Sequence, residues 1–196
     1  MLIVFDGPNC SGKTTLIEKI NKRLVGKYNI FLTKEPTQDA FGKYLKENHS
    51  TFDSTTYLFL ITANRAYHNN TILKNSDKLI LCDRYIPASL ALQQTLDISL
   101  EFIWMINQKF VMPDLTFFIS ASETELEKRL NLRKEKSYIE KNLSRKNEIE
   151  RYRSAYCFMK EKLENVYWLE NDDNTLNIDF IVRKIEEWVK KKDFYD

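Results

Sequence analysis

Residues 7–14 hold a spacing of glycine, lysine and threonine that is typical of a phosphate-binding loop. Their sequence, GPNCSGKT, matches G-x-x-x-x-G-K-[ST], the P-loop pattern of proteins that bind nucleoside triphosphates. Gly7 and Gly12 lack the Cβ atom that would hinder a tight loop, so the loop amides can point inward and surround an anion. Lys13 is then expected to reach the β- and γ-phosphates, and the Thr14 hydroxyl is expected to ligate Mg²⁺.

Asp83 and Arg84 form a second polar cluster, directly after the apolar residues 78–82. If those apolar residues form a strand beside the P-loop strand, a carboxylate at its C-terminal end is well placed to hold Mg²⁺. The guanidinium group of Arg84 can bind a second phosphate through two parallel hydrogen bonds. A kinase needs such a site for its phosphate acceptor, whereas a motor protein or a GTPase needs only to orient water. The alternative interpretation is a salt bridge at the end of a strand.

Glu35, Arg65 and Gln93 are three further polar residues that could serve a substrate. Glu35 follows a short predicted strand, and ligands bind at the carboxyl ends of strands in such sheets. Arg65 lies among mostly apolar residues of a long helical stretch, where an unpaired buried charge would be costly. Its partner is therefore either a substrate phosphate or a structural carboxylate. Gln93 carries a paired donor and acceptor that can recognise a base edge, although glutamine is more often a solvated surface residue.

Residues 128–153 are the most basic stretch of the chain, with ten lysine and arginine residues against four glutamates. We interpret residues 133–147 as a mobile lid that brings arginines onto transferring phosphates and excludes water. A solvated helical face with ion pairs is the alternative. A nucleic-acid surface ranks last, because the aromatic residues in this stretch are only Tyr138 and Tyr152.

The elements that must position these residues alternate between short apolar runs and amphipathic stretches. We predict five strands, over residues 2–6, 29–33, 78–82, 115–119 and 166–169. We predict helices over residues 15–24, 40–47, 55–73, 89–94, 100–110, 124–132, 148–163 and 179–191. Continuous apolar strands separated by helices indicate a parallel sheet covered on both faces, and hence an α/β fold. No interdomain linker is evident, so we expect residues 1–196 to form a single domain.

The composition excludes several classes of protein. Of the 196 residues, 43% are apolar and 30% are charged, and no run of 18 apolar residues suggests a membrane span. The net charge of +2 is too small by itself to indicate binding to nucleic acid. The three cysteines are widely spaced and odd in number, which favours reduced intracellular thiols. Because the sequence starts directly with a predicted core strand, we expect no signal peptide and a cytoplasmic location.

Taken in order, these motifs resemble the thymidylate (dTMP) kinases over roughly residues 1–160. The resemblance is carried by the P-loop and, after it, by Glu35-Pro36-Thr37, Ala63-Asn64-Arg65, Asp83-Arg84-Tyr85, Ser89, Gln93, Pro113-Asp114-Leu115-Thr116 and Arg129-x-x-x-Arg133. It implies a five-stranded parallel sheet of the P-loop kinase fold with a short basic lid. It also implies an enzyme, usually a homodimer, that uses ATP and Mg²⁺ to phosphorylate a deoxynucleoside monophosphate, with dTMP to dTDP as the first choice.

The same resemblance implies roles for individual residues. Catalysis is expected from Lys13, Asp83, Arg84 and Arg133, and Mg²⁺ is expected at Thr14 and Asp83. ATP is expected to contact Gly7, Pro8, Asn9, Cys10, Ser11, Gly12, Lys13, Thr14, Thr15 and Arg129. The deoxynucleoside monophosphate is expected to contact Asn9, Glu35, Phe59, Arg65, Arg84, Tyr85 and Gln93.

Several positions depart from the pattern of the family and leave the base specificity open. Asn9 stands where most members have an acid that contacts the deoxyribose hydroxyl. Ile61 replaces the aromatic residue that stacks on thymine, a role that Phe59 or Tyr57 would have to fill. Two other classes of function stay open. One is a deoxynucleoside kinase, with Glu35 as the base near a 5′-hydroxyl, and the other is a non-catalytic nucleotide-binding relative.

Overall fold

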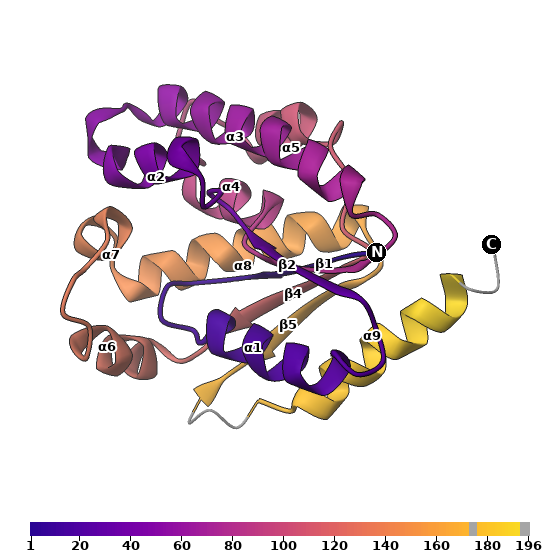
Figure 1. Ribbon diagram of the computed structural model, residues 1–196. Helices are drawn as coiled ribbons and strands as arrows, with labels where there is room; N and C mark the ends of the chain where they lie inside the picture. The colour runs from indigo at the N-terminus through magenta and orange to yellow at the C-terminus, as the bar shows by residue number, and fades with distance from the viewer. Residues whose placement is uncertain (173–175, 193–196) are drawn as a thin grey trace.

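A computed structural model describes residues 1–172 and 176–192 of the chain. Its centre is a sheet of five parallel strands in the order β2-β3-β1-β4-β5 (Figure 1). The strands are β1 (Leu2–Asp6), β2 (Ile30–Lys34), β3 (Leu79–Asp83), β4 (Leu115–Ser120) and β5 (Val166–Glu170). The prediction of an α/β fold with a five-stranded parallel sheet is thereby confirmed.

The register of the strands brings the two predicted phosphate sites to one edge of the sheet. β1 lies between β3 and β4, and Phe5 of β1 is level with Asp83 of β3. The same Asp83 is level with Lys34 of β2. The residues that follow β1, β2 and β3 therefore meet at the carboxyl edge of the sheet, which is where ligands bind in folds of this kind.

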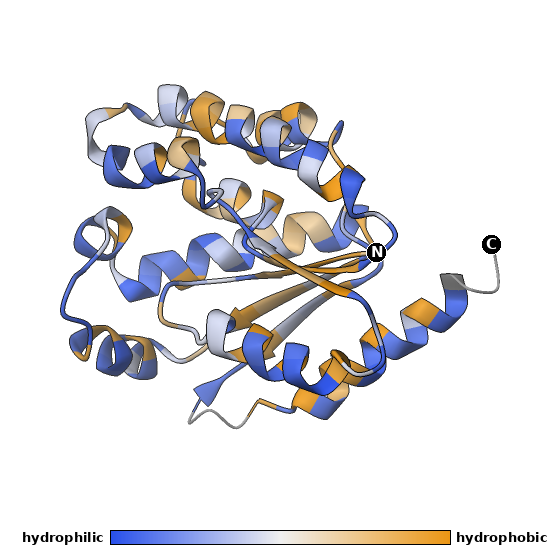
Figure 2. Ribbon diagram, in the orientation of Figure 1, coloured by the Kyte–Doolittle hydropathy of each residue, from blue (hydrophilic) through white to orange (hydrophobic). Residues whose placement is uncertain are grey.

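Helices cover both faces of the sheet and bury two apolar layers (Figures 1 and 2). On one face, α1 (Lys13–Leu24) and α9 (Ile178–Lys192) pack on Ile3 and Phe5. On the other face, Val4 and Phe118 are covered by α3 (Ser54–Lys74), α4 (Ile86–Leu92), α5 (Leu100–Asn107) and α8 (Arg145–Lys162). Toward the carboxyl edge lie α2 (Ala40–Glu47), η1 (His49–Thr51), α6 (Glu123–Asn131) and α7 (Tyr138–Asn142). Within residues 1–172 and 176–192, no helix is both long and apolar enough to cross a membrane.

Three helices near the carboxyl edge differ from those predicted from the sequence. α8 begins at Arg145 rather than at residue 148, because the Ser144 side chain caps it by accepting from the Asn147 amide. α4 starts at Ile86 rather than at Ser89, because Pro87 suits the first turn of a helix, where no backbone N–H is needed. α7 lies in residues 133–147, for which the sequence predicts a lid and no firm helix. It forms because Ser137 and Glu140 make a capping box that satisfies the first backbone amides of the helix.

Candidate active site

The P-loop, residues 7–14, connects β1 to α1 and packs directly against neighbouring backbone and side chains. Gly7 has a φ angle of 140°, and a Cβ atom there would lie 2.0 Å from the carbonyl oxygen of Ile119. Gly12 has a φ angle of 87°, and a Cβ atom there would lie 2.6 Å from the side-chain nitrogen of Asn171. Only glycine fits both positions. The first turn of α1 has no side-chain cap, so its amides are free to bind an anion.

Lys13 lies inside the loop and is held by the loop's own oxygens. Its Nζ atom donates to the carbonyl oxygens of Gly7 and Pro8, at 2.9 and 2.7 Å, and to the Ser11 hydroxyl at 3.2 Å. Burial, together with the nearby guanidinium group of Arg84, lowers the pKa of Lys13 from 10.5 to about 8. Phosphate oxygens would therefore be stronger partners for this ammonium group than the neutral carbonyls that hold it here.

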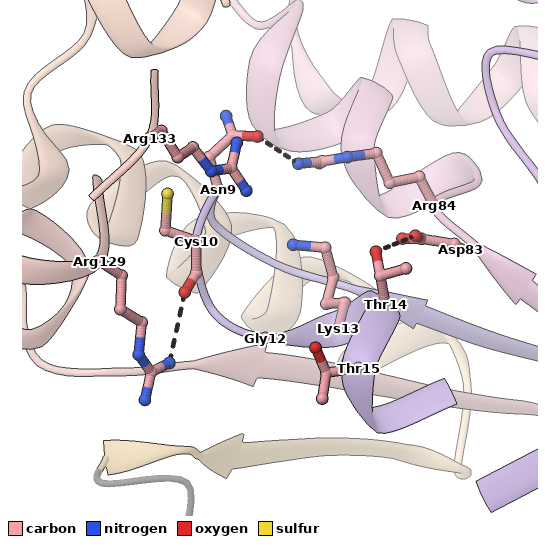
Figure 3. Close-up of a pocket in the computed structure, with 10 residues that line it drawn as sticks. All are labelled: Asn9, Cys10, Gly12, Lys13, Thr14, Thr15, Asp83, Arg84, Arg129 and Arg133. Atoms are coloured by element: carbon pink, nitrogen blue, oxygen red, sulfur yellow. Dashed lines mark hydrogen bonds between the residues drawn. The ribbon is translucent and has the colours of Figure 1, made fainter. Parts of the chain in front are cut away.

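A single cavity of about 270 Å³ joins the two polar clusters predicted from the sequence (Figure 3). Its lining comes from the P-loop, the start of α1, the end of β3, and α6 with the segment that follows it. The lining residues are Asn9, Cys10, Gly12, Lys13, Thr14, Thr15, Asp83, Arg84, Arg129 and Arg133. The four residues expected to act in catalysis, Lys13, Asp83, Arg84 and Arg133, thus face one space.

The two residues expected to hold Mg²⁺ touch one another in this cavity. The Thr14 hydroxyl donates to Asp83 Oδ2 at 2.8 Å. A hydroxyl and a carboxylate are the hard oxygen ligands that Mg²⁺ prefers, and the ion is commonly held by one or two protein groups together with substrate phosphates. The described residues contain no group of three or more His, Cys, Asp or Glu side chains that could hold a metal alone. The donor set therefore fits Mg²⁺ bound together with a nucleotide.

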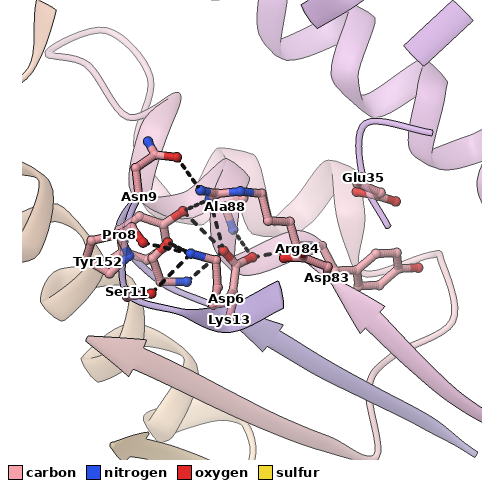
Figure 4. Close-up of polar contacts among 12 residues, drawn as sticks. Asp6, Pro8, Asn9, Ser11, Lys13, Glu35, Asp83, Arg84, Ala88 and Tyr152 are labelled. Carbon is pink, nitrogen blue, oxygen red and sulfur yellow. Dashed lines mark hydrogen bonds and ion pairs between the residues drawn. The ribbon is translucent and has the colours of Figure 1, made fainter. Parts of the chain in front are cut away.

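Arg84 points across the P-loop and is held at three places (Figure 4). Its Nη2 atom donates to Asn9 Oδ1 at 2.9 Å. Its Nη1 atom donates to Asp6 Oδ1 at 3.4 Å and to the Tyr152 hydroxyl. The backbone of Arg84 has a φ angle of 71°, a left-handed conformation that is uncommon for residues other than glycine. A residue held this firmly presents its remaining donors to the cavity in one orientation.

Asp6, which the sequence analysis did not single out, is the buried anchor of this region. Its carboxylate accepts hydrogen bonds from the backbone amides of Gly7, Tyr85 and Ala88, at 2.8–3.1 Å. It also accepts from the Tyr152 hydroxyl and from Arg84. Burial raises the pKa of Asp6, while the charges of Arg84 and Lys13 oppose that shift. The signal in the sequence is a charged residue at the end of an otherwise apolar strand, directly before the P-loop.

The two arginines of the predicted Arg-x-x-x-Arg motif differ in how they are held. Arg129 donates to the backbone oxygens of Cys10 and Asn171, at 3.3 and 2.7 Å. It therefore links the P-loop to the segment that follows β5. Arg133 contacts Glu140 of α7 at 2.5 Å, and its side chain remains 48% exposed. Arg133 is consequently the easier of the two to redirect toward a phosphate.

Arg65 has a structural partner, which answers the question that its position in the sequence left open. Its Nη2 atom lies 2.7 Å from Glu35 Oε2, and both side chains are almost fully buried. The Nε atom of Arg65 donates to the same carboxylate at 2.8 Å. Its Nη1 atom donates to Asn107 Oδ1, and its Nη2 atom also donates to Ser89 Oγ and to the Tyr85 carbonyl oxygen. Contact of Arg65 or Glu35 with a substrate stays a prediction, because neither residue lines the cavity described above.

Three further residues expected to contact substrate lie outside that cavity. Phe59 is 51% exposed, and its ring packs against Phe102 of α5 at 6.3 Å. The side chain of Tyr85 is buried in the core, with its hydroxyl unbonded within the described part of the chain. Gln93 is also buried, and its Oε1 atom likewise finds no hydrogen-bond donor among the residues described. An unbonded acceptor of this kind suits a ligand N–H, so base recognition by Gln93 stays a prediction.

Comparisons with known proteins agree with one another. A family model with the description "Thymidylate kinase" matches residues 5–184 of the chain. A "Probable thymidylate kinase" of Methanocaldococcus jannaschii is 30% identical over 193 residues, which cover 95% of this chain and 90% of that protein. A "Thymidylate kinase" of Acholeplasma laidlawii is 40% identical over 129 residues. That match covers 61% of this chain and 64% of the relative, less than two thirds of the relative's length.

Two solved structures share the fold of the chain. The thymidylate kinase of Ehrlichia chaffeensis aligns with a TM-score of 0.67 and 23% identity, over 97% of this chain and 98% of that one. The thymidylate kinase of Candida albicans aligns with a TM-score of 0.71 and 19% identity, over 100% of this chain and 93% of that one. At these identities the alignments establish the same arrangement of strands and helices.

Proposed function

The chain belongs to the thymidylate kinase family, and from that premise we propose that it transfers the γ-phosphoryl group of ATP to dTMP, giving ADP and dTDP. The observation that carries the proposal is the cavity lined by both Lys13 and Arg84. Lys13 belongs to a loop built for the phosphates of a nucleoside triphosphate, whereas Arg84 provides a separate cationic group next to it. A phosphoryl donor and a phosphorylated acceptor can thus bind side by side.

Positioning and charge neutralisation supply the catalysis in this proposal. Lys13 exchanges the carbonyl oxygens of Gly7 and Pro8 for oxygens of the donor phosphates. Arg84 holds the acceptor phosphate, one oxygen of which attacks the γ-phosphorus while the bond to the β,γ-bridging oxygen breaks. Arg133 leaves Glu140 and neutralises the charge that develops on the transferring group. Mg²⁺ supplies further neutralisation of phosphate charge when it is bound with ATP, and Thr14 and Asp83 are the residues that would hold it.

The pairing of Glu35 supports a phosphorylated acceptor over a nucleoside acceptor. A kinase that phosphorylates a 5′-hydroxyl needs a base within hydrogen-bond reach of that hydroxyl. Glu35 is the candidate base, yet its two carboxylate oxygens bond to Arg65 at 2.7 Å and to His68 at 3.0 Å. Both oxygens of Glu35 are therefore already bonded to protein side chains, and Glu35 does not line the cavity that contains Lys13 and Arg84.

A coupled assay with ATP and Mg²⁺ tests the function, with dTMP, dUMP, dGMP and thymidine supplied separately as acceptors. We expect turnover with dTMP and none with thymidine. Turnover of thymidine without dTMP would instead identify a deoxynucleoside kinase. If none of the four acceptors reacts, the chain is a nucleotide-binding relative without this activity.

Binding of the triphosphate should take up a proton at alkaline pH, because phosphate oxygens raise the pKa of Lys13 from about 8. At pH 8.5 a substantial fraction of the ligand-free lysine is neutral, so binding of a non-hydrolysable ATP analogue should absorb a measurable fraction of a proton. At pH 6.5 the lysine is already charged, and the uptake should vanish. Calorimetric titrations in two buffers with different ionisation enthalpies measure this quantity. Equal uptake at the two pH values would remove Lys13 as its source.

We propose further that the chain forms a homodimer through the outer face of α3. Tyr67 and Leu73 on this helix are 56% and 53% exposed. Figure 2 shows apolar residues along α3 and along its neighbour α5. An exposed apolar surface of this kind is typical of a protein–protein interface. The proposal requires sedimentation equilibrium to give twice the chain mass of 23.4 kDa, and a single chain mass would refute it.

A further inference from the structure

We propose that Glu148 and Tyr152, one turn apart on α8, are positioning residues that fix Arg84 in the orientation that receives the acceptor phosphate. The proposal rests on the proposed function for the identity of that acceptor. Both residues lie in the stretch that the sequence presents as basic and solvated, yet both are fully buried. Neither is expected to touch either nucleotide, so each would act through Arg84.

Tyr152 holds one end of the Arg84 guanidinium group. The Tyr152 hydroxyl donates to Asp6 Oδ1 at 3.1 Å and accepts from Arg84 Nη1. A hydroxyl has one proton to donate, so its bond to Asp6 leaves the lone pairs of the oxygen to Arg84. Burial raises the pKa of Tyr152 well above its usual value, which keeps the phenol neutral and this direction intact.

Glu148 holds the other end through Asn9. Glu148 Oε1 accepts from both the backbone nitrogen and the side-chain Nδ2 atom of Asn9, at 2.8 and 2.9 Å. An amide side chain can orient in two ways, and a carboxylate can only accept. Glu148 therefore turns the Nδ2 atom of Asn9 toward itself and leaves Oδ1 facing Arg84 Nη2 at 2.9 Å.

The same geometry explains why an uncharged amide at position 9 suits this chain. Two carboxylates at the 2.9 Å that separates Asn9 Nδ2 from Glu148 could not both be ionised, and no hydrogen bond would join them. The carboxylate of this pair therefore belongs to Glu148 of α8, and the P-loop residue bonded to it, Asn9, is uncharged. Glu148 is in turn paired with Arg145, which also reaches the carbonyl oxygen of Glu140 at 3.4 Å. A chain of polar contacts thus connects Arg84, through Asn9, Glu148 and Arg145, to Glu140 of α7 in the predicted lid.

Kinetic constants of the variants Tyr152→Phe and Glu148→Gln test the proposal. Each should raise the KM for dTMP by about 5- to 20-fold and lower kcat by several fold, because one hydrogen bond to the phosphate-binding group is lost or misdirected. The KM for ATP should change by less than about twofold. The matched changes Tyr156→Phe and Glu150→Gln, on the same helix, should leave all three constants near those of the unchanged protein. Equal effects on ATP and dTMP would indicate a general structural role and overturn the proposal.

A charge exchange tests the link through Asn9. Asn9→Asp alone should weaken dTMP binding by at least about tenfold, because it opposes Glu148 with a second carboxylate. Adding Glu148→Gln should restore part of the loss, because an amide can donate to the new carboxylate. Strictly multiplicative effects of the two changes would exclude coupling between Asn9 and Glu148, and with it the role of Glu148.

Nuclear magnetic resonance of the ligand-free protein separates this inference from the proposed function. The guanidinium protons of Arg84, assigned by their absence in Arg84→Lys, should exchange slowly with water in the unchanged protein and much faster in Tyr152→Phe and Glu148→Gln. This measurement needs no turnover, so it decides the inference even if dTMP proves not to be an acceptor. Exchange rates unchanged in both variants would overturn it.

Discussion

Replacing Lys13 with alanine should lower kcat/KM for ATP by about 10³-fold or more, which corresponds to roughly 4 kcal/mol of transition-state stabilisation. Lys13 is the cation at the base of the P-loop, and it lines the cavity that it shares with Arg84. Charge that develops between donor and acceptor is stabilised most by a fixed cation that is already in place. Steady-state kinetics with ATP as the varied substrate measure the loss.

Stability measurements separate this effect from damage to the fold. Removing Lys13 leaves the carbonyl oxygens of Gly7 and Pro8 without their donor, but it also removes a buried charge whose pKa is lowered by that burial. These contributions oppose one another, so the free energy of unfolding should change by less than about 2 kcal/mol. Lys19→Ala, on the exposed side of α1, is the matched control and should leave kcat/KM unchanged. Retention of a tenth of the activity by Lys13→Ala would contradict the role assigned to it.

Replacing Arg65 with methionine should lower the free energy of unfolding by about 3–5 kcal/mol. The guanidinium group is 1% exposed and binds Glu35, Asn107, Ser89 and the Tyr85 carbonyl oxygen. Methionine fills similar space but cannot donate a hydrogen bond, so Glu35 would be left as a buried charge with only His68 beside it. Denaturation in urea, followed by circular dichroism, measures the change.

Two further variants show whether burial of the pair is the cause. Arg23 forms an ion pair with Asp179 at 2.5 Å, but the two side chains are 61% and 76% exposed. Arg23→Met should therefore cost less than about 1 kcal/mol. The double variant Arg65→Met/Glu35→Leu also lacks the Glu35 carboxylate, so no buried charge is left unpaired. Its free energy of unfolding should therefore be higher than that of Arg65→Met alone. A loss at Arg65 no larger than that at Arg23 would contradict the argument.

Local patterns were sufficient to predict the sheet and the P-loop side of the site. Five apolar runs became the five strands, and the spacing from Gly7 to Thr14 placed Lys13 and Thr14 at the start of α1. The position of Asp83 could be predicted because the carboxyl ends of parallel strands lie at a common edge of the sheet. The observed register, in which Asp83 of β3 is paired with Phe5 of β1, agrees with this prediction. Membership of the thymidylate kinase family, suggested by the order of these motifs, is confirmed.

The supports of the site could not be predicted because they join residues far apart in the chain. Tyr152 reaches Asp6 across 146 positions, and Glu148 reaches Asn9 across 139 positions. In the sequence both residues lie among charged neighbours, where helical periodicity alone does not say which side faces the core. The partner of Arg65 was undecided for a related reason, since burial of an arginine predicts an anion but not its identity. Roles of individual residues in catalysis and binding, the single domain and the lid stay predictions.

The hydrogen bonds of Asp6 have a consequence for how the protein must move. One carboxylate ties the first residue of the P-loop, the backbone after β3, the start of α4 and the middle of α8 into one unit. The P-loop and Arg84 are therefore held at a fixed distance from one another. Any rearrangement during a reaction cycle is therefore expected in the elements that Asp6 does not join. The distance between the P-loop and Arg84, across which a phosphoryl group would be transferred, is fixed when the chain folds.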